Sequence, residues 1–331
     1  MKWVPNLRGD DSRGFWNAAF VPALLLIVVL LFFRGHPHLV TALYFGSMLS
    51  SIAQLLIIVS GLSFIMSCGG VDLSIGGQVF LIVVSMSLAA GRQVHPVLIL
   101  LVGLMVGLLC GCANGLLVAV LGVPPFIATF ASSFVFSGVA KTLVTMGAHM
   151  ATLTDVPLSN VGFFVFHLDF LIALAVLVLS SFLLNHTYWG RYTLAVGTNE
   201  HAARRAGLRI GRIQWSAYTY SGLTNAIAAT VLFANEGLAI TSVDTELMLS
   251  AIAAVVLGNA NLLCDKNQSA RVRVAHIAAA VLLLHLINIS AGEMFHSAYV
   301  QQITTSVILF LAFAVDRRSR RRERHEIRAD D

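Results

Sequence analysis

Residues 97–121 read VLILLVGLMVGLLCGCANGLLVAVL, an uninterrupted run of 25 residues without Asp, Glu, Lys, Arg or His. About 20 consecutive apolar residues are enough for an α-helix to cross the hydrocarbon core of a bilayer. The run therefore predicts a membrane-spanning helix. Its glycines recur at every fourth position, as Gly103, Gly107, Gly111 and Gly115, and so share one face of that helix. We expect a neighbouring helix to approach closely along this ridge, as general packing rather than as a dedicated dimer motif.

The composition of the whole chain agrees with a membrane protein. Of 331 residues, 57% are hydrophobic and 11% are charged, and the mean hydropathy is +0.83. A soluble domain carries about 25% charged residues. These values argue against a soluble protein, and the long continuous apolar runs argue against a transmembrane β-barrel, whose strands alternate in polarity. The net charge of +5 comes from basic clusters between apolar runs, so we expect no nucleic-acid partner.

The uncharged runs predict an all-α fold, a polytopic helical bundle with about ten transmembrane helices. The predicted segments are residues 18–33, 42–66, 73–90, 97–121, 126–146, 169–184, 213–235, 248–264, 274–290 and 298–315. No small-residue cleavage site follows the first segment, so we expect it to be a retained helix rather than a signal peptide. Residues 18–315 would form a single transmembrane domain between a cytoplasmic N-terminus, 1–17, and a basic cytoplasmic tail, 316–331.

The lysine and arginine residues predict the orientation. With a cytoplasmic N-terminus and about ten crossings, 18 of the 21 basic residues fall into cytoplasmic segments. The opposite orientation would place the same residues outside, so we predict that both termini are cytoplasmic. The longest cytoplasmic loop is then 185–212. Four predicted helices lie directly before the sixth segment, and four follow the loop after it. The first set starts from outside and the second from inside, which is the pattern of an inverted repeat.

Residues 69–74, GGVDLS, interrupt the apolar runs. Gly69 and Gly70 favour a helix break. Asp72, followed by Ser74, can accept hydrogen bonds from the free N–H groups at the start of the next helix. A carboxylate in a membrane segment is a functional candidate by default. We favour a structural cap near the cytoplasmic edge over direct contact with a substrate.

Residues 197–208, GTNEHAARRAGL, lie in the predicted cytoplasmic loop. Thr198 or Asn199 can cap a short helix that begins near Glu200, and Gly207 can end it. Such a helix buries little surface by itself, and a partner protein with a groove would explain it. The alternative is a solvated loop whose arginines only set the topology, and composition alone favours this alternative.

These two motifs, in this order, resemble the inner-membrane permease family of bacterial sugar ABC importers, of the ribose, galactose and xylose type. Three further stretches match the family in order, GVPPFIAT at 122–129, YSGL at 220–223 and AIAAVVLG at 251–258, so the resemblance spans residues 42–315. The chain departs from the family at residues 259–266, where NANLLCDK replaces a glycine-rich loop. It also carries Gly138 and Lys141 where members often have an arginine.

The resemblance implies a transport subunit that imports a monosaccharide, a pentose or a hexose, across the inner membrane. It implies a second permease copy, identical or paralogous, a cytoplasmic ABC ATPase and a periplasmic sugar-binding protein as partners, within membrane lipid. The short helix would pass the motion of the ATPase to the membrane helices. The residues expected to do so are Asn199, Glu200, Ala203, Arg204, Arg205 and Gly207.

A passage for a neutral, hydroxyl-rich solute needs scattered polar groups rather than charges. The candidates are the polar residues Asn114, Thr129, Thr224 and Asn225, together with Phe126 of the 122–129 stretch. Hydrogen bonds between packed helices explain such polar residues at least as well.

The sequence carries no recognisable catalytic set. It has no Gly-Lys pair and therefore no P-loop, so ATP hydrolysis is expected on a partner chain. Its 11 histidines show no metal-ligand spacing, and we expect no metal, no cofactor and no enzymatic activity. Two alternatives remain, an ABC permease for another small solute such as a branched-chain amino acid, and an ion-coupled secondary transporter. The latter needs buried ionisable groups, whereas residues 93–140 contain no Asp, Glu, Lys or Arg.

Overall fold

The structure is a computed structural model that describes residues 34, 42–146, 162–163, 166–236, 245–258, 274–295, 303–308 and 310. Its long helices are α2 (Ala42–Ser67), α3 (Ile75–Gly91), α4 (Pro96–Gly115), α5 (Pro125–Thr145), α6 (Leu168–His186), α9 (Ile210–Glu236), α10 (Thr245–Gly258) and α11 (Val274–Phe295). The shorter elements are α7 (Tyr188–Thr198), α8 (Glu200–Arg205), the π-helical turn η2 (Leu116–Val120) and an antiparallel pair of strands, β1 (Gly162–Phe163) and β2 (Phe166–His167). The all-α prediction is confirmed, with this strand pair as a small addition.

Every predicted segment from 42–66 to 274–290 overlaps with one of the long helices. Of the last predicted segment, 298–315, residues 303–308 are helical. The predicted helix 18–33, the terminal segments 1–17 and 316–331, and the 259–266 loop lie outside the described residues. The number of helices, their orientation and the inverted repeat therefore stay predictions.

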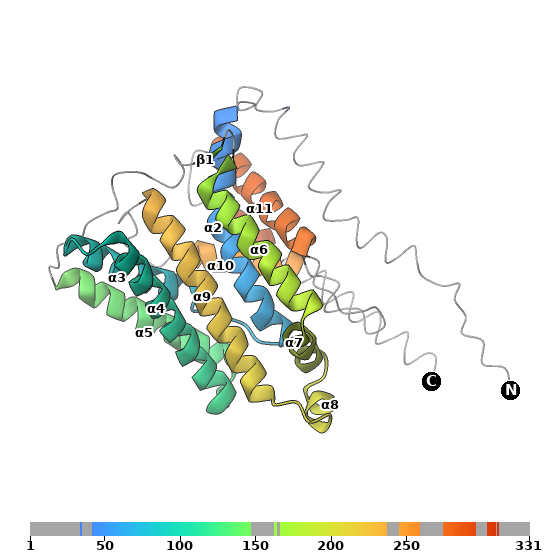
Figure 1. Ribbon diagram of the computed structural model, residues 1–331. Coiled ribbons are helices and arrows are strands. Elements are labelled where there is room, and N and C mark those ends of the chain that lie inside the picture. Colours follow the sequence, from blue (N-terminus) through green and yellow to red (C-terminus); the bar gives the residue numbers. More distant parts are fainter. Residues whose placement is uncertain are drawn as a thin grey trace.

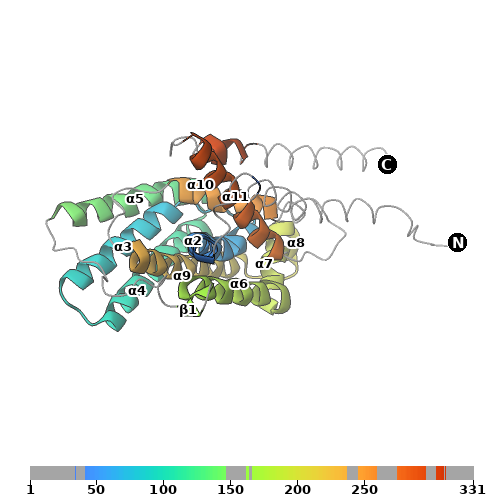
Figure 2. The same cartoon turned by 90° about the horizontal axis from the view of Figure 1, so that it is seen from above.

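Two helices, α2 and α9, lie side by side in the middle of the molecule (Figure 1). On one side α3 and α4 pack against α9, and α5 packs on α3. On the other side α6 packs against α2, and α10 with α11 also contacts α2. Seen from above, α3, α4 and α5 lie on one side of this central pair and α6 and α11 on the other (Figure 2). Residues of α2 and α9 therefore reach most of the bundle.

Three glycines of the α4 ridge, Gly107, Gly111 and Gly115, face α9, whereas Gly103 faces Met86 of α3. A Cβ atom at Gly107 would lie 2.6 Å from the carbonyl oxygen of Gly222, and one at Gly111 would lie 2.6 Å from the carbonyl oxygen of Tyr218. Real Cβ atoms do not approach backbone atoms so closely, so a larger residue would push the two helices apart. The ridge packs against helices of the same chain, as predicted from the sequence.

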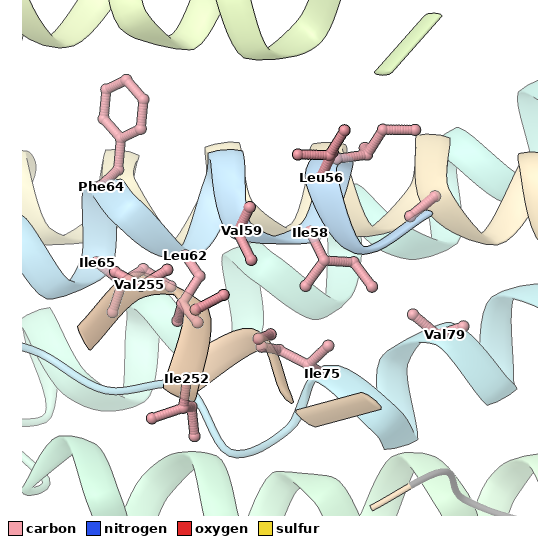
Figure 3. Close-up of a cluster of buried hydrophobic side chains, with 14 of the residues drawn as sticks. Leu56, Ile58, Val59, Leu62, Phe64, Ile65, Ile75, Val79, Ile252 and Val255 are labelled. Atoms are coloured by element: carbon pink, nitrogen blue, oxygen red, sulfur yellow. The ribbon is translucent and has the colours of Figure 1, made fainter. Parts of the chain in front are cut away.

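Apolar side chains fill the space between α2, α3 and α10 (Figure 3). Leu62 of α2 and Ile75 of α3 are fully buried, and Ile252 of α10 is nearly so. On the opposite side of α2, Phe64 points away from this cluster and stacks on Trp189, with ring centroids 4.5 Å apart. Because α2 is buried on several faces, it is apolar all round rather than amphipathic.

The polarity of α9 follows from its central position. Four helices of the described residues are long and apolar enough to cross a membrane, at Met48–Ser67, Pro96–Val120, Pro125–Thr145 and Leu168–His186. Helix α9 is longer, with 27 residues, yet it contains many polar side chains. Ser221, Thr224 and Asn225 among them are at most 1% exposed. They face other helices, so their polarity does not meet lipid.

The predicted helix at 97–121 is confirmed as a candidate membrane span, Pro96–Val120, and its last turn is π-helical. The N–H of Leu121 donates to the carbonyl of Leu116, five residues back, at 3.0 Å. Gly122 follows with φ +68°, and Pro124 precedes the first residue of α5. Proline has no N–H to continue a helix, so the chain must leave one helix and start another here. Turns of this kind are common at functional sites.

Candidate functional site

The connection between α2 and α3 is built from the GGVDLS motif. Gly69 has φ +81°, a left-handed conformation that favours glycine. Its N–H donates to the carbonyl of Met66 and the N–H of Gly70 donates to that of Ile65, both at 3.0 Å. This pair of bonds is a Schellman motif, which satisfies the last carbonyls of α2. The predicted break at Gly69 and Gly70 is where α2 ends.

Asp72 follows in this connection and is 1% exposed. Its Oδ1 accepts hydrogen bonds from the backbone N–H of Ser74, at 2.8 Å, and from the Ser74 hydroxyl. Its Oδ2 accepts a bond from Nε2 of Gln78 at 3.2 Å. The carboxylate therefore sits at the N-terminus of α3, where the helix dipole favours a negative charge.

A buried polar network spreads from Asp72 across three helices. The Ser74 hydroxyl accepts bonds from Nε2 of Gln78 at 2.6 Å and from Nδ2 of Asn114, on α4, at 2.7 Å. Oε1 of Gln78 accepts a bond from Nδ2 of Asn225, on α9, at 3.1 Å. We call these five residues the Asp72 network; its four other members have no exposed surface.

The donor directions in the Asp72 network follow from the carboxylate. The Ser74 hydroxyl has one proton, which it donates to Asp72. Gln78 and Asn114 must then turn their NH₂ groups towards Ser74. This leaves Oδ1 of Asn114 and Oδ1 of Asn225 buried and without a hydrogen-bond partner among the described residues. Both oxygens are free to accept a bond from a water molecule or a hydroxyl group.

Two further side chains hold the backbone of the same connection. Thr129 of α5 accepts a bond from the N–H of Leu73 at 3.1 Å, and the Tyr218 hydroxyl of α9 donates to the carbonyl of Val71 at 3.1 Å. The connection is thus tied to α5 and α9 as well as to α3 and α4. Unpaired backbone groups at membrane depth are costly, which explains why each partner is supplied by a helix.

The other two pathway candidates lie apart from this network. Thr224 donates to the carbonyl of Ser221 at 2.9 Å and faces Gly61 of α2. Phe126 is 61% exposed on α5, and its ring stacks with that of Phe130. The structure therefore brings Asn114 and Asn225 together and ties Thr129 to the connection beside them. That any of the candidates lines a passage stays a prediction.

The predicted 185–212 loop contains two helices. Its first, α7, was not predicted; it begins after Thr187, whose hydroxyl accepts a bond from the N–H of Gly190 at 3.2 Å. The Thr198 hydroxyl donates to the carbonyl of Leu194 within α7, so it does not cap α8. Asn199 does, because its Oδ1 accepts a bond from the N–H of Ala202 at 2.9 Å.

The short helix predicted near Glu200 is present as α8, and it projects from one end of the bundle (Figure 1). The helix ends at Arg205, and Gly207 follows with φ +82°. The N–H of the next residue, Leu208, donates to the carbonyl of Ala203 and closes this end of the helix. Ala203 is buried and fixes the helix to the protein. The outer side is polar: Glu200 and Arg204 form an exposed ion pair at 3.0 Å, and Arg205 is also exposed.

The model of one protein family, described as "Branched-chain amino acid transport system / permease component", matches residues 44–314. The chain belongs to this family. The permease is 30% identical to the ribose import permease protein RbsC of Bacillus subtilis, over 89% of this chain and 91% of the relative. It is 30% identical to the fructose import permease protein FruF of Bifidobacterium longum, over 74% and 71% of the two chains.

The permease is also 26% identical to the autoinducer 2 import system permease protein LsrD of Photorhabdus laumondii, over 76% of this chain and 77% of the relative. No solved structure matches it. These relatives and the apolar helices show an inner-membrane transport component, and they support a role that is not enzymatic. The family resemblance predicted from the motifs is confirmed.

Two residues of the Asp72 network and its surroundings were missed in the sequence. Gln78 is one polar residue in an apolar run, but it lies four residues after Ser74 and therefore on the same helix face. That spacing was the available signal. Tyr218 carried no such signal, because its partner is the backbone of Val71, far away in the sequence.

Proposed function

We propose that this chain is the transmembrane permease subunit of an ABC importer that moves a monosaccharide, a pentose or a hexose, across the inner membrane. The observation that carries the proposal is the similarity to a ribose import permease over 89% of the chain. Energy would come from ATP hydrolysis on a separate ATPase subunit. A second permease copy and a periplasmic sugar-binding protein would complete the importer.

The contact with the ATPase is assigned to α8. Its cap residues, Asn199 and Gly207, fix both ends, so a six-residue helix keeps its shape in water. The exposed Glu200, Arg204 and Arg205 offer charged groups to a groove on a cytoplasmic protein. This proposal is supported by the burial of Ala203, since a helix that is packed against the bundle can transmit a movement to it.

A contiguous path leads from α8 to the Asp72 network. Gly197, at the end of α7, packs against the backbone of Ser67 at the end of α2. Gly69 and Asp72 lie two and five residues after Ser67 in the chain. We infer that movement of α8 displaces the α2–α3 connection and, through its hydrogen bonds, changes how α3, α4 and α9 pack.

The Asp72 network supplies the groups for a neutral solute. The amide oxygens of Asn114 and Asn225 lack partners among the described residues and accept hydrogen bonds, as sugar hydroxyls require. Both residues are buried, so the helices must separate before a solute reaches them. A hydroxyl-rich solute that enters would satisfy two acceptors that packing leaves empty.

A branched-chain amino acid is the second candidate substrate, because the family description names this class. An amino acid carries an ammonium and a carboxylate, which need charged or strongly polar partners. The carboxylate of Asp72 already accepts three hydrogen bonds from Ser74 and Gln78. The sugar candidate is therefore preferred for this network.

The substrate class is tested by uptake into proteoliposomes that contain the permease, its ATPase and the binding protein. Radiolabelled ribose, fructose and leucine are compared at equal concentration. We expect saturable uptake of at least one of the two sugars and no uptake of leucine. Uptake of leucine without either sugar would reject the monosaccharide and retain the family assignment.

A further inference from the structure

The outer face of α7 carries two tyrosines and an arginine. Tyr188 and Tyr192 are 71% and 43% exposed, four residues apart on the same face. Arg191 is exposed between them, with its guanidinium carbon 4.5 Å from the centre of the Tyr188 ring. Within the described part of the chain, no carboxylate forms an ion pair with Arg191. This face therefore offers one uncompensated positive charge and two phenol groups.

The opposite face of α7 fixes the direction of these side chains. Nε1 of Trp189 donates to the hydroxyl of Ser216 at 2.8 Å, and the Trp189 ring stacks on Phe64. Thr193 and Val196 are also buried on this side. Because the inner face is held by both hydrogen bonds and ring contacts, the tyrosines and Arg191 cannot turn inwards.

The outer face of α7 continues an exposed apolar surface on α6, of the kind that faces lipid tails in membrane proteins. Helix α6 exposes a row of large apolar side chains at helical spacing, which are Leu171, Leu174, Val178, Leu179 and Phe182. Only Thr187 separates α6 from α7. Figure 1 shows α7 nearly end-on beside the end of α6, so the chain turns across the bundle where the apolar row stops. Tyrosine and arginine at such a position are typical of the headgroup level of a bilayer.

We propose that the outer face of α7 binds the headgroup of an anionic phospholipid. The Arg191 guanidinium donates hydrogen bonds to the lipid phosphate, and the hydroxyls of Tyr188 and Tyr192 donate to its oxygens. The charges are complementary, since an arginine fork matches phosphate geometry. The lipid would hold α7 at the membrane surface next to α8. This inference rests on membrane insertion and α7 geometry, and it does not depend on the sugar assignment.

The test uses the full-length permease in detergent and native mass spectrometry with phosphatidylglycerol, or with phosphatidylcholine of the same chains. The permease is expected to retain phosphatidylglycerol preferentially. Arg191→Gln should weaken this binding about tenfold, the size of one lost charge-assisted hydrogen bond. Arg92→Gln is the matched control, because Arg92 is equally an exposed arginine but follows α3. The Arg92 variant should bind the lipid as the wild type does.

Three results would overturn the proposal. These are equal retention of the two lipids, unchanged phosphatidylglycerol binding in Arg191→Gln, and an equal loss in Arg92→Gln. A separate pull-down of the ATPase with Arg191→Gln tests whether α7 contacts a protein instead. If this variant loses the ATPase and keeps the lipid, α7 is a protein contact. Failure of the lipid proposal leaves sugar uptake by the reconstituted importer unaffected, so the two proposals are tested separately.

Discussion

Gly197, in the last turn of α7, packs directly against the backbone carbonyl of Ser67, the last residue of α2. A Cβ atom on Gly69, two residues further, would also lie 3.8 Å from the Cα of Gly197. The segment that presents α8 therefore touches the connection that holds Asp72. The contact joins two backbones, so no side chain can be rearranged to relieve a change there.

A methyl group at Gly197 should break this coupling. Gly197→Ala places a Cβ onto the Ser67 carbonyl, and overpacking of this kind costs about 1–3 kcal/mol. We expect ATP-dependent uptake to fall roughly tenfold. Gly138→Ala is the control, because nothing lies within 4 Å of a Cβ at that position. Equal uptake by Gly197→Ala and the wild type would remove α7 from the coupling path.

The backbone conformation at Gly207 can be tested by substitution, because an added Cβ atom there clashes with no neighbour. Its φ is +82°, and no atom lies within 4 Å of an added Cβ, so a substitution there acts through backbone strain alone. Gly207→Val should weaken the end of α8 by about 1–2 kcal/mol and reduce binding of the ATPase in a pull-down. Gly207→Asn should bind nearly normally, because asparagine tolerates this conformation. Similar ATPase binding by both variants would contradict the assignment of α8.

The Asp72 network should behave as one unit in stability measurements. Asp72→Asn turns one acceptor into a donor that faces the donors of Ser74 or Gln78, and the expected loss is about 1–3 kcal/mol in thermal unfolding. Ser74→Ala removes the hydroxyl that three partners share. In the double variant the losses should be clearly smaller than the sum of the two single losses. Strict additivity would show that the network is not cooperative.

The ridge of α4 should tolerate no side chain. Gly111→Ala would bring a Cβ to 2.6 Å from the Tyr218 carbonyl oxygen and must separate α4 from α9. The expected destabilisation is about 1–3 kcal/mol, seen as a lower unfolding temperature of the single chain in detergent. If the variant is as stable as the wild type but changes only the oligomeric state, the ridge is a contact between copies instead.

The helix positions could be predicted because membrane segments are long, apolar and bounded by charges. The α8 caps were also readable, since Asn199 and Gly207 act through local bonds that a short sequence specifies. Helix α7 was missed because its 11 residues mix aromatic, glycine and polar positions, and its inner face is defined by Phe64 and Ser216 from other helices.

The Asp72 network could be predicted only in part. Asp72 was expected to accept N–H groups before the next helix, and it takes that of Ser74. The bonds to Asn114 and Asn225 join residues 40 and more positions apart, which no spacing rule connects. Both asparagines were selected for a passage, and hydrogen bonding between packed helices was the stated alternative. The structure shows that bonding; a role in the passage remains to be tested.

The energy source of uptake tests the central claim most directly. The permease is reconstituted with its ATPase and binding protein. Uptake of labelled sugar is followed with ATP supplied on the side of the membrane that carries the ATPase, and with ion gradients collapsed. The account predicts uptake that requires ATP, the ATPase and the binding protein together. Sugar uptake by the permease alone, driven by a proton or sodium gradient and indifferent to ATP, would contradict it.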